Sequence, residues 1–439
     1  MTRSLLAAMK QMIDVKAYEE PFLAPRYAEP IARLFQLLTQ EGGRRDHALT
    51  EYGLYRLYAA RDGESGLKEA LAHLEEALRI QPSPTALFAI ADAQYGLGNL
   101  ERAFELLRDL KREGHRISQH PYYFFLQFQC AVQMGRMDLA QLAMENWGGE
   151  EKPLAGRRLV VTTSSGPGDV LRTLAGLFPQ LEAAESLRVV CQPRLWPFVR
   201  AVLPQAQFLE STDLKDPSEN LVSIPYALDF CLNHVGKRIP PFAARLWKAP
   251  EIQEAAERIR AAFPELREGA CAFHWRTNMM NARRMSRCLH PTELRGFLAD
   301  DRFPKICFQH GLSPHERKYL EQHGKNVVIA EDRLSVYENL FNLYALVAQC
   351  SATLGPGLTG TEFASISGAP VFAVDVDGRW RNRNGYGYEG RDVYFPNTYR
   401  YGRPYGVGGA ESVKRATRKI AEIVAKERAQ PGEPLAPAP

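Results

Sequence analysis

The sequence predicts two consecutive α/β lobes, each built on a parallel sheet, preceded by a domain of α-helical repeats. Three observations lead to this fold class. Over about residues 20–150, apolar residues recur three and four positions apart without strand-like alternation. Over residues 155–265 and again over 266–428, β-branched segments alternate with helical ones, which is typical of parallel strands joined by crossover helices. Each of these two runs also contains a glycine-rich turn between a strand and a helix.

The composition limits the classes of protein to which the chain can belong. Its 439 residues suffice for two or three domains, and 45% apolar with 24% charged residues is typical of a soluble globular protein. The net charge of +4 and the pI near 8.6 fit a small anionic ligand or a weak contact with a membrane surface, but are too mild to argue for nucleic acid. Seven cysteines without a Cys-x-x-Cys pair favour reduced thiols in the cytoplasm over disulfides or a zinc site. We expect no transmembrane segment, because no apolar run could span a bilayer.

Small residues recur at a regular spacing in the helical domain, which we assign to residues 1–150. Each copy has an alanine early in a helix, an apolar residue four positions later and a glycine in the preceding turn: Ala70, Leu74 and Gly63; Ala103, Leu107 and Gly98; Ala140, Met144 and Gly135. The alanines are 33 and 37 residues apart, which indicates a helix-turn-helix repeat. The pattern resembles tetratricopeptide repeats, which implies a concave surface for a peptide or protein. The alternative is a helical cap that only covers the core of the next domain.

The first α/β lobe covers residues 155–265 and starts with a β-branched strand at 158–163. The turn Gly166-Pro-Gly-Asp169 follows and leads into a helix. Two more strands are expected near 187–192 and 207–210, with a helix between them near 195–203. Asp169, next to Gly168, lies at the start of a helix, so its carboxylate could act as a general base or simply cap the helix.

The second α/β lobe covers residues 266–428. We expect strands at 270–276, 305–309, 327–330, 352–355 and from 371, and helices near 291–300, 314–322, 335–349, 361–367 and 410–427. Ser335 and Glu338 have the spacing of a capping box. Both lobes are therefore expected to be Rossmann-like and to face one another across a cleft at the carboxyl ends of their strands. The Pro- and Ala-rich tail, 429–439, is expected to be disordered.

A glycine-rich turn joins the strand at 352–355 to the next helix. It contains three glycines and two threonines, namely Gly355, Gly357, Gly360, Thr359 and Thr361. The missing Cβ atoms would let backbone amides approach a ligand, and the positive end of the helix dipole lies there as well. We expect a phosphate-bearing ligand at this turn, with Glu362 accepting hydrogen bonds from a ribose. The alternative is a structural turn, since the spacing matches neither a Walker loop nor the GxGxxG motif.

Cationic side chains follow other strands of the second lobe. One group ends the strand at 270–276 and continues into the next loop: His274, Arg276, Arg283, Arg284 and Arg287. A guanidinium fork suits a diphosphate, although an exposed basic loop and a core histidine are the alternatives. His310 follows the strand at 305–309, where contacts to a base or ribose would be made.

Two segments, 379–388 and 394–403, interleave arginine with aromatic rings and glycine. This suits stacking on a base or sugar. Single-stranded nucleic acid is a rival ligand, but the mild net charge and the lack of an RNA-binding module argue against it. A loop that folds over the cleft without touching a ligand is the other alternative. Asp375 and Asp377 have DxD spacing but are expected to bend the chain, so no metal site is predicted.

These residues resemble the heptosyltransferase-like family of two-lobed (GT-B) glycosyltransferases over roughly residues 155–428. The resemblance is carried by the turn ending at Asp169, by the Trp-Arg pair at 275–276 with its basic loop, and by Gly357-Leu-Thr-Gly-Thr-Glu362. Helical repeats ahead of such lobes are also similar to bacterial relatives of protein O-GlcNAc transferases. The family's turn usually reads Asp-Thr/Ser-Gly-x-x-His, whereas Gly357 and Glu362 stand at the aspartate and histidine positions here.

The resemblance implies inverting transfer of a sugar from a nucleotide-diphosphate sugar to a protein or glycan acceptor, without a cofactor. Asp169 would be the base, and the second lobe would hold the donor. The donor's phosphates would be contacted by Arg276, Arg284, Arg287, Thr359, Gly360 and Thr361. The altered turn motivates one alternative, a non-catalytic scaffold with a degenerate glycosyltransferase fold. A nucleotide-sugar epimerase is another.

Overall fold

The computed structural model describes most of the chain. The described residues are 49, 64–119, 121–136, 138–139, 142–143, 156–162, 167–209, 220–223, 247–277, 288–376, 389–392, 395–403 and 408–429. Several expectations from the sequence lie outside them: the first part of the helical domain, Gly63, Ala140, Met144, the loop with Arg283, Arg284 and Arg287, the segment 379–388 and tail residues 430–439.

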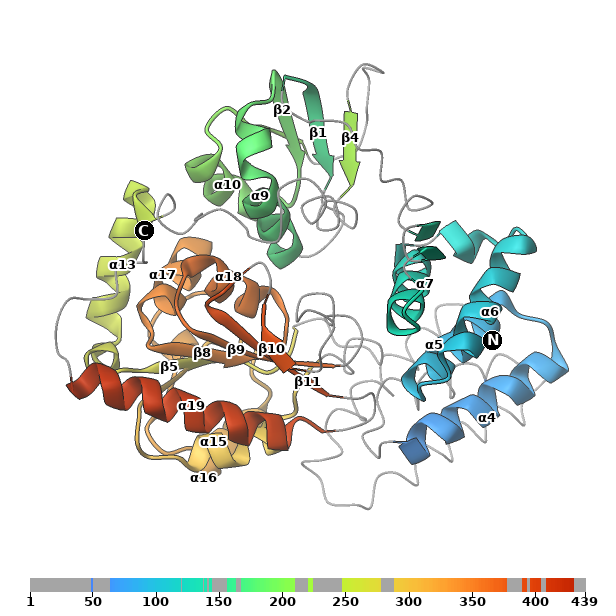
Figure 1. Ribbon diagram of the computed structural model, residues 1–439. Coiled ribbons are helices and arrows are strands. Elements are labelled where there is room, and N and C mark those ends of the chain that lie inside the picture. The colour runs from blue at the N-terminus through green and yellow to red at the C-terminus, as the bar shows by residue number, and fades with distance from the viewer. Residues whose placement is uncertain are drawn as a thin grey trace.

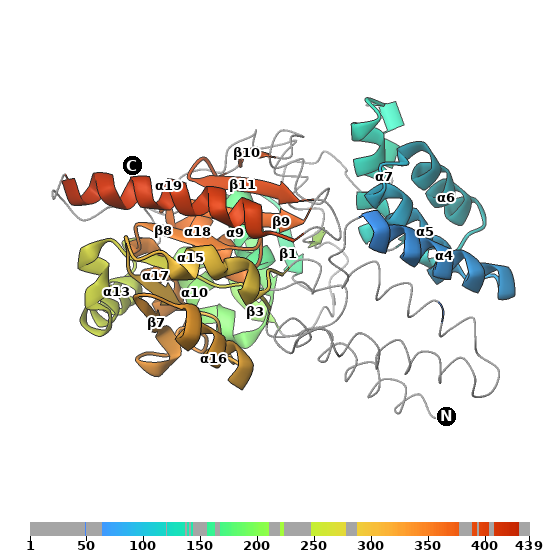
Figure 2. The same ribbon diagram turned by 90° about the horizontal axis from the view of Figure 1, so that it is seen from below.

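The helical domain lies to one side of the two lobes (Figures 1 and 2). Its described α-helices include α4 (Glu64–Ile80), α5 (Pro84–Gly96), α6 (Leu100–Arg112) and α7 (Pro121–Gln133). Ser83 caps α5 by accepting a hydrogen bond from the Ala86 amide, and Pro84 starts the helix where no amide donor is needed. The turns after α5 and α7 use Gly98 and Gly135 at φ of +82° and +73°, a conformation that glycine adopts without steric cost.

The predicted repeat positions form the core of this domain. Ala70, Leu74, Ala103 and Leu107 are fully buried in one apolar cluster shared by α4, α5, α6 and α7. The Tyr123 hydroxyl of α7 donates to the Leu107 carbonyl of α6 at 2.6 Å. The helical prediction is confirmed for the described residues of this domain, while its assignment to tetratricopeptide repeats stays a prediction.

The first lobe contains a four-stranded parallel sheet of order β3-β2-β1-β4. Its strands are β1 (Arg158–Thr162), β2 (Ser186–Val190), β3 (Gln207–Leu209) and β4 (Asn220–Ser223), and its helices include α9 (Pro167–Glu182) and α10 (Trp196–Val202). Val161 pairs with Val189 on one side and Val222 on the other. These β-branched side chains explain why the segment forms a buried central strand.

The second lobe contains a seven-stranded sheet of order β10-β11-β9-β8-β5-β6-β7, parallel except for the β10–β11 pair. Its strands are β5 (Cys271–Phe273), β6 (Lys305–Cys307), β7 (Val327–Ile329), β8 (Ala352–Gly355), β9 (Val371–Val376), β10 (Glu389–Arg391) and β11 (Thr398–Arg403). The principal helices are α13 (Pro250–Ala262), α15 (Arg295–Ala299), α16 (Pro314–His323), α17 (Leu340–Gln349), α18 (Thr359–Ser367) and α19 (Ala410–Ala429). The sequence placed α13 in the first lobe, but it packs on α17, where Gln349 donates to the Ala256 carbonyl and Arg258 donates to Asn342. The order reverses between β5 and β8, as in doubly wound sheets, so the predicted α/β architecture is confirmed.

Three local expectations differ from the structure. Asn339, and not Ser335, caps α17, because the Asn339 side chain accepts from the amides of Phe341 and Asn342. Ser335 Oγ accepts from the Glu338 amide at 3.3 Å, which is one of the two hydrogen bonds of the expected capping box. The segment 394–403 contains β11 and is therefore part of the sheet, and Asp375 lies within β9 and does not bend the chain.

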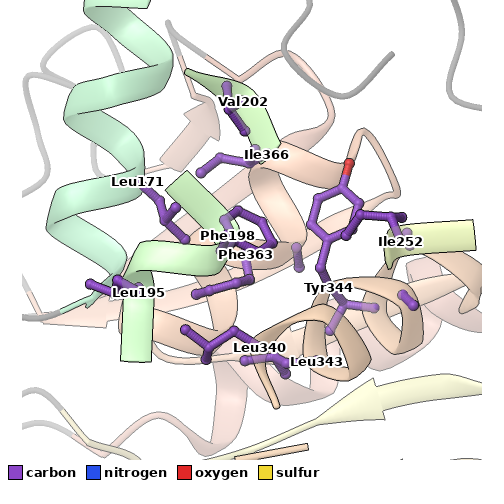
Figure 3. Packing of buried hydrophobic residues seen from close by; sticks show 14 of the residues in the cluster. Leu171, Leu195, Phe198, Val202, Ile252, Leu340, Leu343, Tyr344, Phe363 and Ile366 are labelled. Carbon is purple, nitrogen blue, oxygen red and sulfur yellow. The ribbon is translucent and has the colours of Figure 1, made fainter. Parts of the chain in front are cut away.

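The two lobes share one continuous apolar core. The Phe198 ring of α10 lies among three rings of the second lobe, 5.6 Å from Phe341, 5.8 Å from Tyr344 and 5.4 Å from Phe363. Figure 3 shows Phe198 against Phe363, with Leu171 of α9 nearby. The facing helices of the lobes are thus in direct contact here, where a cleft was expected.

Candidate functional site

The glycine-rich turn lies at the topological switch point of the second sheet. β8 ends at Gly355, the adjacent β5 ends at Phe273, and α18 begins at Thr359. From β5 the sheet continues to β6 and β7 on one side and to β8 and β9 on the other, so the strand order reverses between β5 and β8. Ligands of such sheets bind at this point, outside the carboxyl ends of the strands. The turn therefore occupies the position at which a Rossmann-like lobe binds its ligand.

Two of the glycines make room for rings of the protein itself. A Cβ at Gly355 would lie 2.5 Å from the His274 ring. A Cβ at Gly360 would lie 2.5 Å from the Phe308 ring. The expectation that these glycines clear space for a ligand is corrected, because protein atoms fill that space.

The third glycine admits a carboxylate. The Gly357 amide donates to Asp375 Oδ1 at 2.7 Å, and a Cβ at Gly357 would overlap the same oxygen. The amide of Gly357 is therefore directed at Asp375 and is not offered to a ligand.

His274 is a core histidine, the alternative that the sequence left open. Its Nε2 lies 2.9 Å from Thr361 Oγ1, and the Thr361 hydroxyl donates to the carbonyl of Pro356. Since this hydroxyl has one proton, Nε2 must carry the proton of the neutral ring and donate it to Thr361. Burial lowers the pKa of His274 to about 3, so the ring is uncharged at neutral pH. His274 therefore fixes Thr361 but brings no positive charge to the turn.

Arg276, expected near a diphosphate, is paired inside the protein. Its Nε and Nη2 donate to the two carboxylate oxygens of Glu316 at 2.6 and 2.7 Å, and Nη2 also donates to the Gly311 carbonyl at 2.6 Å. Trp275 Nε1 donates to the same carboxylate at 2.8 Å, and Glu316 completes a capping box with Ser313. The expected role of Arg276 is corrected: Glu316 neutralises its charge, and the pair anchors the start of the basic loop.

Glu362, expected to bind a ribose, lies in a buried cluster of charges. It is 2% exposed, and its Oε1 is 3.4 Å from Nη2 of Arg400. Arg400 also donates to Asp375 at 2.5 Å and to Asp392 at 2.6 Å. Burial alone would lower the pKa of Arg400, but the three carboxylates outweigh it and raise that pKa above its ordinary value. The expected role of Glu362 is corrected, because its carboxylate belongs to this ion-pair cluster.

The glycine-rich turns of the two lobes touch one another. A Cβ at Gly168, in the first turn of α9, would lie 2.8 Å from Thr359 Cα and 3.3 Å from the Glu362 side chain. Asp169 is the next residue of α9, but its side chain lies outside the described residues. The amino-terminal ends of α9 and α18, one from each lobe, therefore meet.

The first amides of α18 need an acceptor from outside the helix. Those of Thr359, Gly360 and Thr361 have no partner within the helix, as at any helix start. The N-cap residue is Leu358, and no described side chain caps the helix. Together with the start of α9, these amides bring two positive helix ends to the junction. They lie next to the three carboxylates and one guanidinium of the ion-pair cluster around Arg400.

His310 belongs to another group, at the carboxyl end of β6. Its ring stacks on Tyr337 with centroids 3.8 Å apart and an interplanar angle of 3°, and its Nδ1 pairs with Glu331. Arg194 of the first lobe lies 4.7 Å from the centroid of Tyr337. Because the imidazole covers one face of Tyr337, Arg194 lies over the other and links the lobes. The structure thus groups Gly168, His274, Thr359, Gly360, Thr361 and Glu362 at the junction and places His310 in this separate stack.

No role was predicted for Glu316, Tyr337 or Asp392. Arg400 was expected only as part of the segment 394–403, which suited stacking on a base or sugar, but its guanidinium is buried among three carboxylates. A signal existed only for Arg400, because the β-prone run Tyr399-Arg-Tyr401 predicts a strand that could hold a buried arginine. Arg276, the partner of Glu316, is 40 residues away in the sequence. Asp392 is eight residues from Arg400, but no sequence pattern marks the two as a pair.

No protein-family model matches the sequence, and no curated protein matches it significantly. Among the described helices, none is both long and apolar enough to cross a membrane. Within the same part of the chain, no group of three or more His, Cys, Asp or Glu side chains could hold a metal ion.

Proposed function

We propose that the protein is a two-lobed glycosyltransferase of the GT-B type, which transfers a sugar from a nucleotide-diphosphate sugar to a protein or glycan acceptor. The observation that carries the proposal is the meeting of the amino-terminal ends of α9 and α18, where Gly168 packs on Thr359. The positive ends of two helix dipoles at one place favour a phosphate-bearing ligand. The junction also lies outside the carboxyl ends of both parallel sheets.

In this proposal, Asp169 accepts the proton of an acceptor hydroxyl. The acceptor oxygen forms a bond to the anomeric carbon, and the bond from that carbon to the nucleoside diphosphate breaks with inversion. The amides of Thr359, Gly360 and Thr361 stabilise the departing diphosphate, assisted by Arg284 and Arg287 of the basic loop. His274 acts only by holding Thr361.

The first test combines donor binding with turnover. Calorimetric titration with uridine, guanosine and adenosine diphosphate sugars should identify one donor that binds. Asp169→Asn should then lower the transfer rate by about 10²- to 10⁴-fold, as expected for loss of a general base. Near-wild-type turnover by this variant would remove Asp169 from the role, and absence of heat with every donor would contradict the proposal.

The second test addresses the junction itself. Gly168→Ala forces the Thr359 backbone to move, and overpacking of this kind costs about 1–3 kcal/mol of folding stability. Because the displaced backbone carries the Thr359 amide, donor affinity should fall below that of the wild type. Gly296→Ala is the matched control, because a Cβ at Gly296 of α15 meets nothing within 4 Å. Equal donor affinity in the two variants would show that the meeting of the helices is unrelated to the ligand.

A non-catalytic scaffold is the second candidate function. It is favoured by the internal pairing of three residues that were expected to meet the donor, namely His274, Arg276 and Glu362. A scaffold would give no transfer in any donor and acceptor combination, even where the protein captures a partner.

We further propose that the helical domain is a tetratricopeptide-like array that holds a protein partner or the acceptor, and that the protein works in the cytoplasm. The buried alanine and leucine positions of α4 and α6 support the first statement. The second is supported by the six described cysteines, all buried and free. Cross-linking of the full chain in cells, followed by mass spectrometry, would identify such a partner, and links that avoid α4, α5, α6 and α7 would contradict the assignment.

A further inference from the structure

One buried guanidinium joins four segments around the glycine-rich turn. Glu362 lies in the first turn of α18, Asp375 near the end of β9, Asp392 just after β10, and Arg400 in β11. Arg400 reaches the three carboxylates at 3.4, 2.5 and 2.6 Å respectively. We call these four residues the Arg400 clamp.

The clamp holds the turn at both ends. At its start, Asp375 Oδ1 accepts the Gly357 amide at 2.7 Å, while Asp375 Oδ2 accepts from Arg400. At its end, Glu362 pairs with the same guanidinium. The segment that carries the three uncapped amides, 359–361, therefore lies between two points fixed to one arginine.

Burying the four charged side chains of the clamp costs more free energy than a purely structural role requires. All four side chains are buried, and burying charges costs several kcal/mol per ion unless their pairing is close to ideal. An apolar cluster of the same volume would often be equally stable. Its placement directly against the turn points to control of the turn's geometry.

We propose that Arg400 and Asp375 are positioning residues for phosphate binding, an inference that rests on the proposed function. Asp375 turns the Gly357 amide inward, and Arg400 fixes both Asp375 and Glu362. The amides of Thr359, Gly360 and Thr361 are then held ready for an anion before it arrives, which reduces the ordering cost of binding.

Asp375→Asn tests the clamp, because it replaces a carboxylate by a neutral amide and leaves the volume of the side chain almost unchanged. An asparagine has one acceptor oxygen, so its amide nitrogen would face either the Arg400 guanidinium or the Gly357 amide, donor against donor, and the ion pair is lost in both orientations. Hydrogen exchange at the turn amides should accelerate, and affinity for the nucleoside diphosphate should fall on the order of tenfold. Affinity for the nucleoside alone should stay unchanged, which a general loss of structure would not allow. The matched control is Asp332→Asn, which breaks an exposed pair with Arg317 in the same lobe.

A second pair of variants approaches the same contact from the other side. Gly357→Ala places a methyl group on the Asp375 carboxylate and should destabilise the lobe. Adding Asp375→Ala relieves the overlap, so the melting temperature should recover in part, while diphosphate affinity stays low because the clamp remains broken. Recovery of both quantities would overturn the inference.

The inference and the proposed function fail in different ways. If the wild type binds a nucleoside diphosphate and Asp375→Asn binds it equally well, with unchanged exchange at the turn, the clamp is not a positioning device. If the wild type binds no nucleoside diphosphate but the variant still accelerates exchange at 357–361, the proposed function fails and the clamp stands only as the restraint on the turn.

Discussion

Replacing Phe198 by alanine should uncouple the two lobes. The side chain is 1% exposed, and its ring has aromatic contacts with Phe341, Tyr344 and Phe363 of the other lobe. A buried Phe→Ala change costs about 3–5 kcal/mol, and each aromatic pair adds about 0.5–1.5 kcal/mol to the value of burial. Three pairs place the expected loss at the upper end, about 5 kcal/mol, and most of it falls on the contact between the lobes.

Scanning calorimetry of the full chain measures this coupling directly. We expect the unfolding of the two lobes to separate into distinct transitions in Phe198→Ala, with the less stable lobe melting first. Phe208→Ala is the control, because the half-buried Phe208 ring stacks on Trp196 within the first lobe at 5.7 Å. The reasoning is refuted if Phe198→Ala melts like the wild type, or if the control produces the same separation.

The remaining predictions concern buried polar groups of the second lobe. Glu316→Ala leaves the buried guanidinium of Arg276 without its carboxylate and should lower stability by about 3–5 kcal/mol in denaturant unfolding; a loss below 1 kcal/mol would show that the pair contributes little. Lys305 donates to three backbone carbonyls, so Lys305→Met should cost about 1–3 kcal/mol. Burial lowers the pKa of Lys305 from 10.5 to about 8. Between these two pH values the unfolded state binds more protons than the folded state, so Lys305 makes the free energy of unfolding rise with pH. This rise should disappear in Lys305→Met. Burial lowers the pKa of His274 from 6.5 to about 3, so the free energy of unfolding should fall as the pH drops from 6.5 to 3, by at most ~1.4 kcal/mol per pH unit. His274→Gln keeps a donor for Thr361 and should flatten this pH dependence. An unchanged pH dependence in the variant would contradict the assignment.

The parts of the fold that were predicted correctly are those with local signals. The helical period of residues 64–133, the β-branched run at β1 and the short apolar run at β8 depend on neighbours a few positions away, so they can be read from one sequence. The two glycine-rich turns were found for the same reason, since a strand, a turn and a helix are consecutive.

The chemistry of the site could not be predicted in the same way. Arg276 and Glu362 look available in the sequence because their partners, Glu316 and Arg400, are 40 and 38 residues away. The same holds for His274, whose partner Thr361 is 87 residues away. Residue type and strand position identify a candidate, but only the packed structure decides whether its charge or donor is already used.

The filled glycine positions do not argue against a ligand at the turn. A turn whose glycines are occupied by the His274 ring and the Asp375 carboxylate is rigid, and rigid amides bind an anion without an ordering cost. Both an enzyme and a binding protein would gain from such a turn. Asp169 of the first lobe separates the two functions, because only transfer requires a base. If Asp169→Asn still binds the donor but no longer transfers the sugar, the protein is an enzyme. If the wild type binds the donor but transfers no sugar, the protein is a binding protein for the nucleotide sugar.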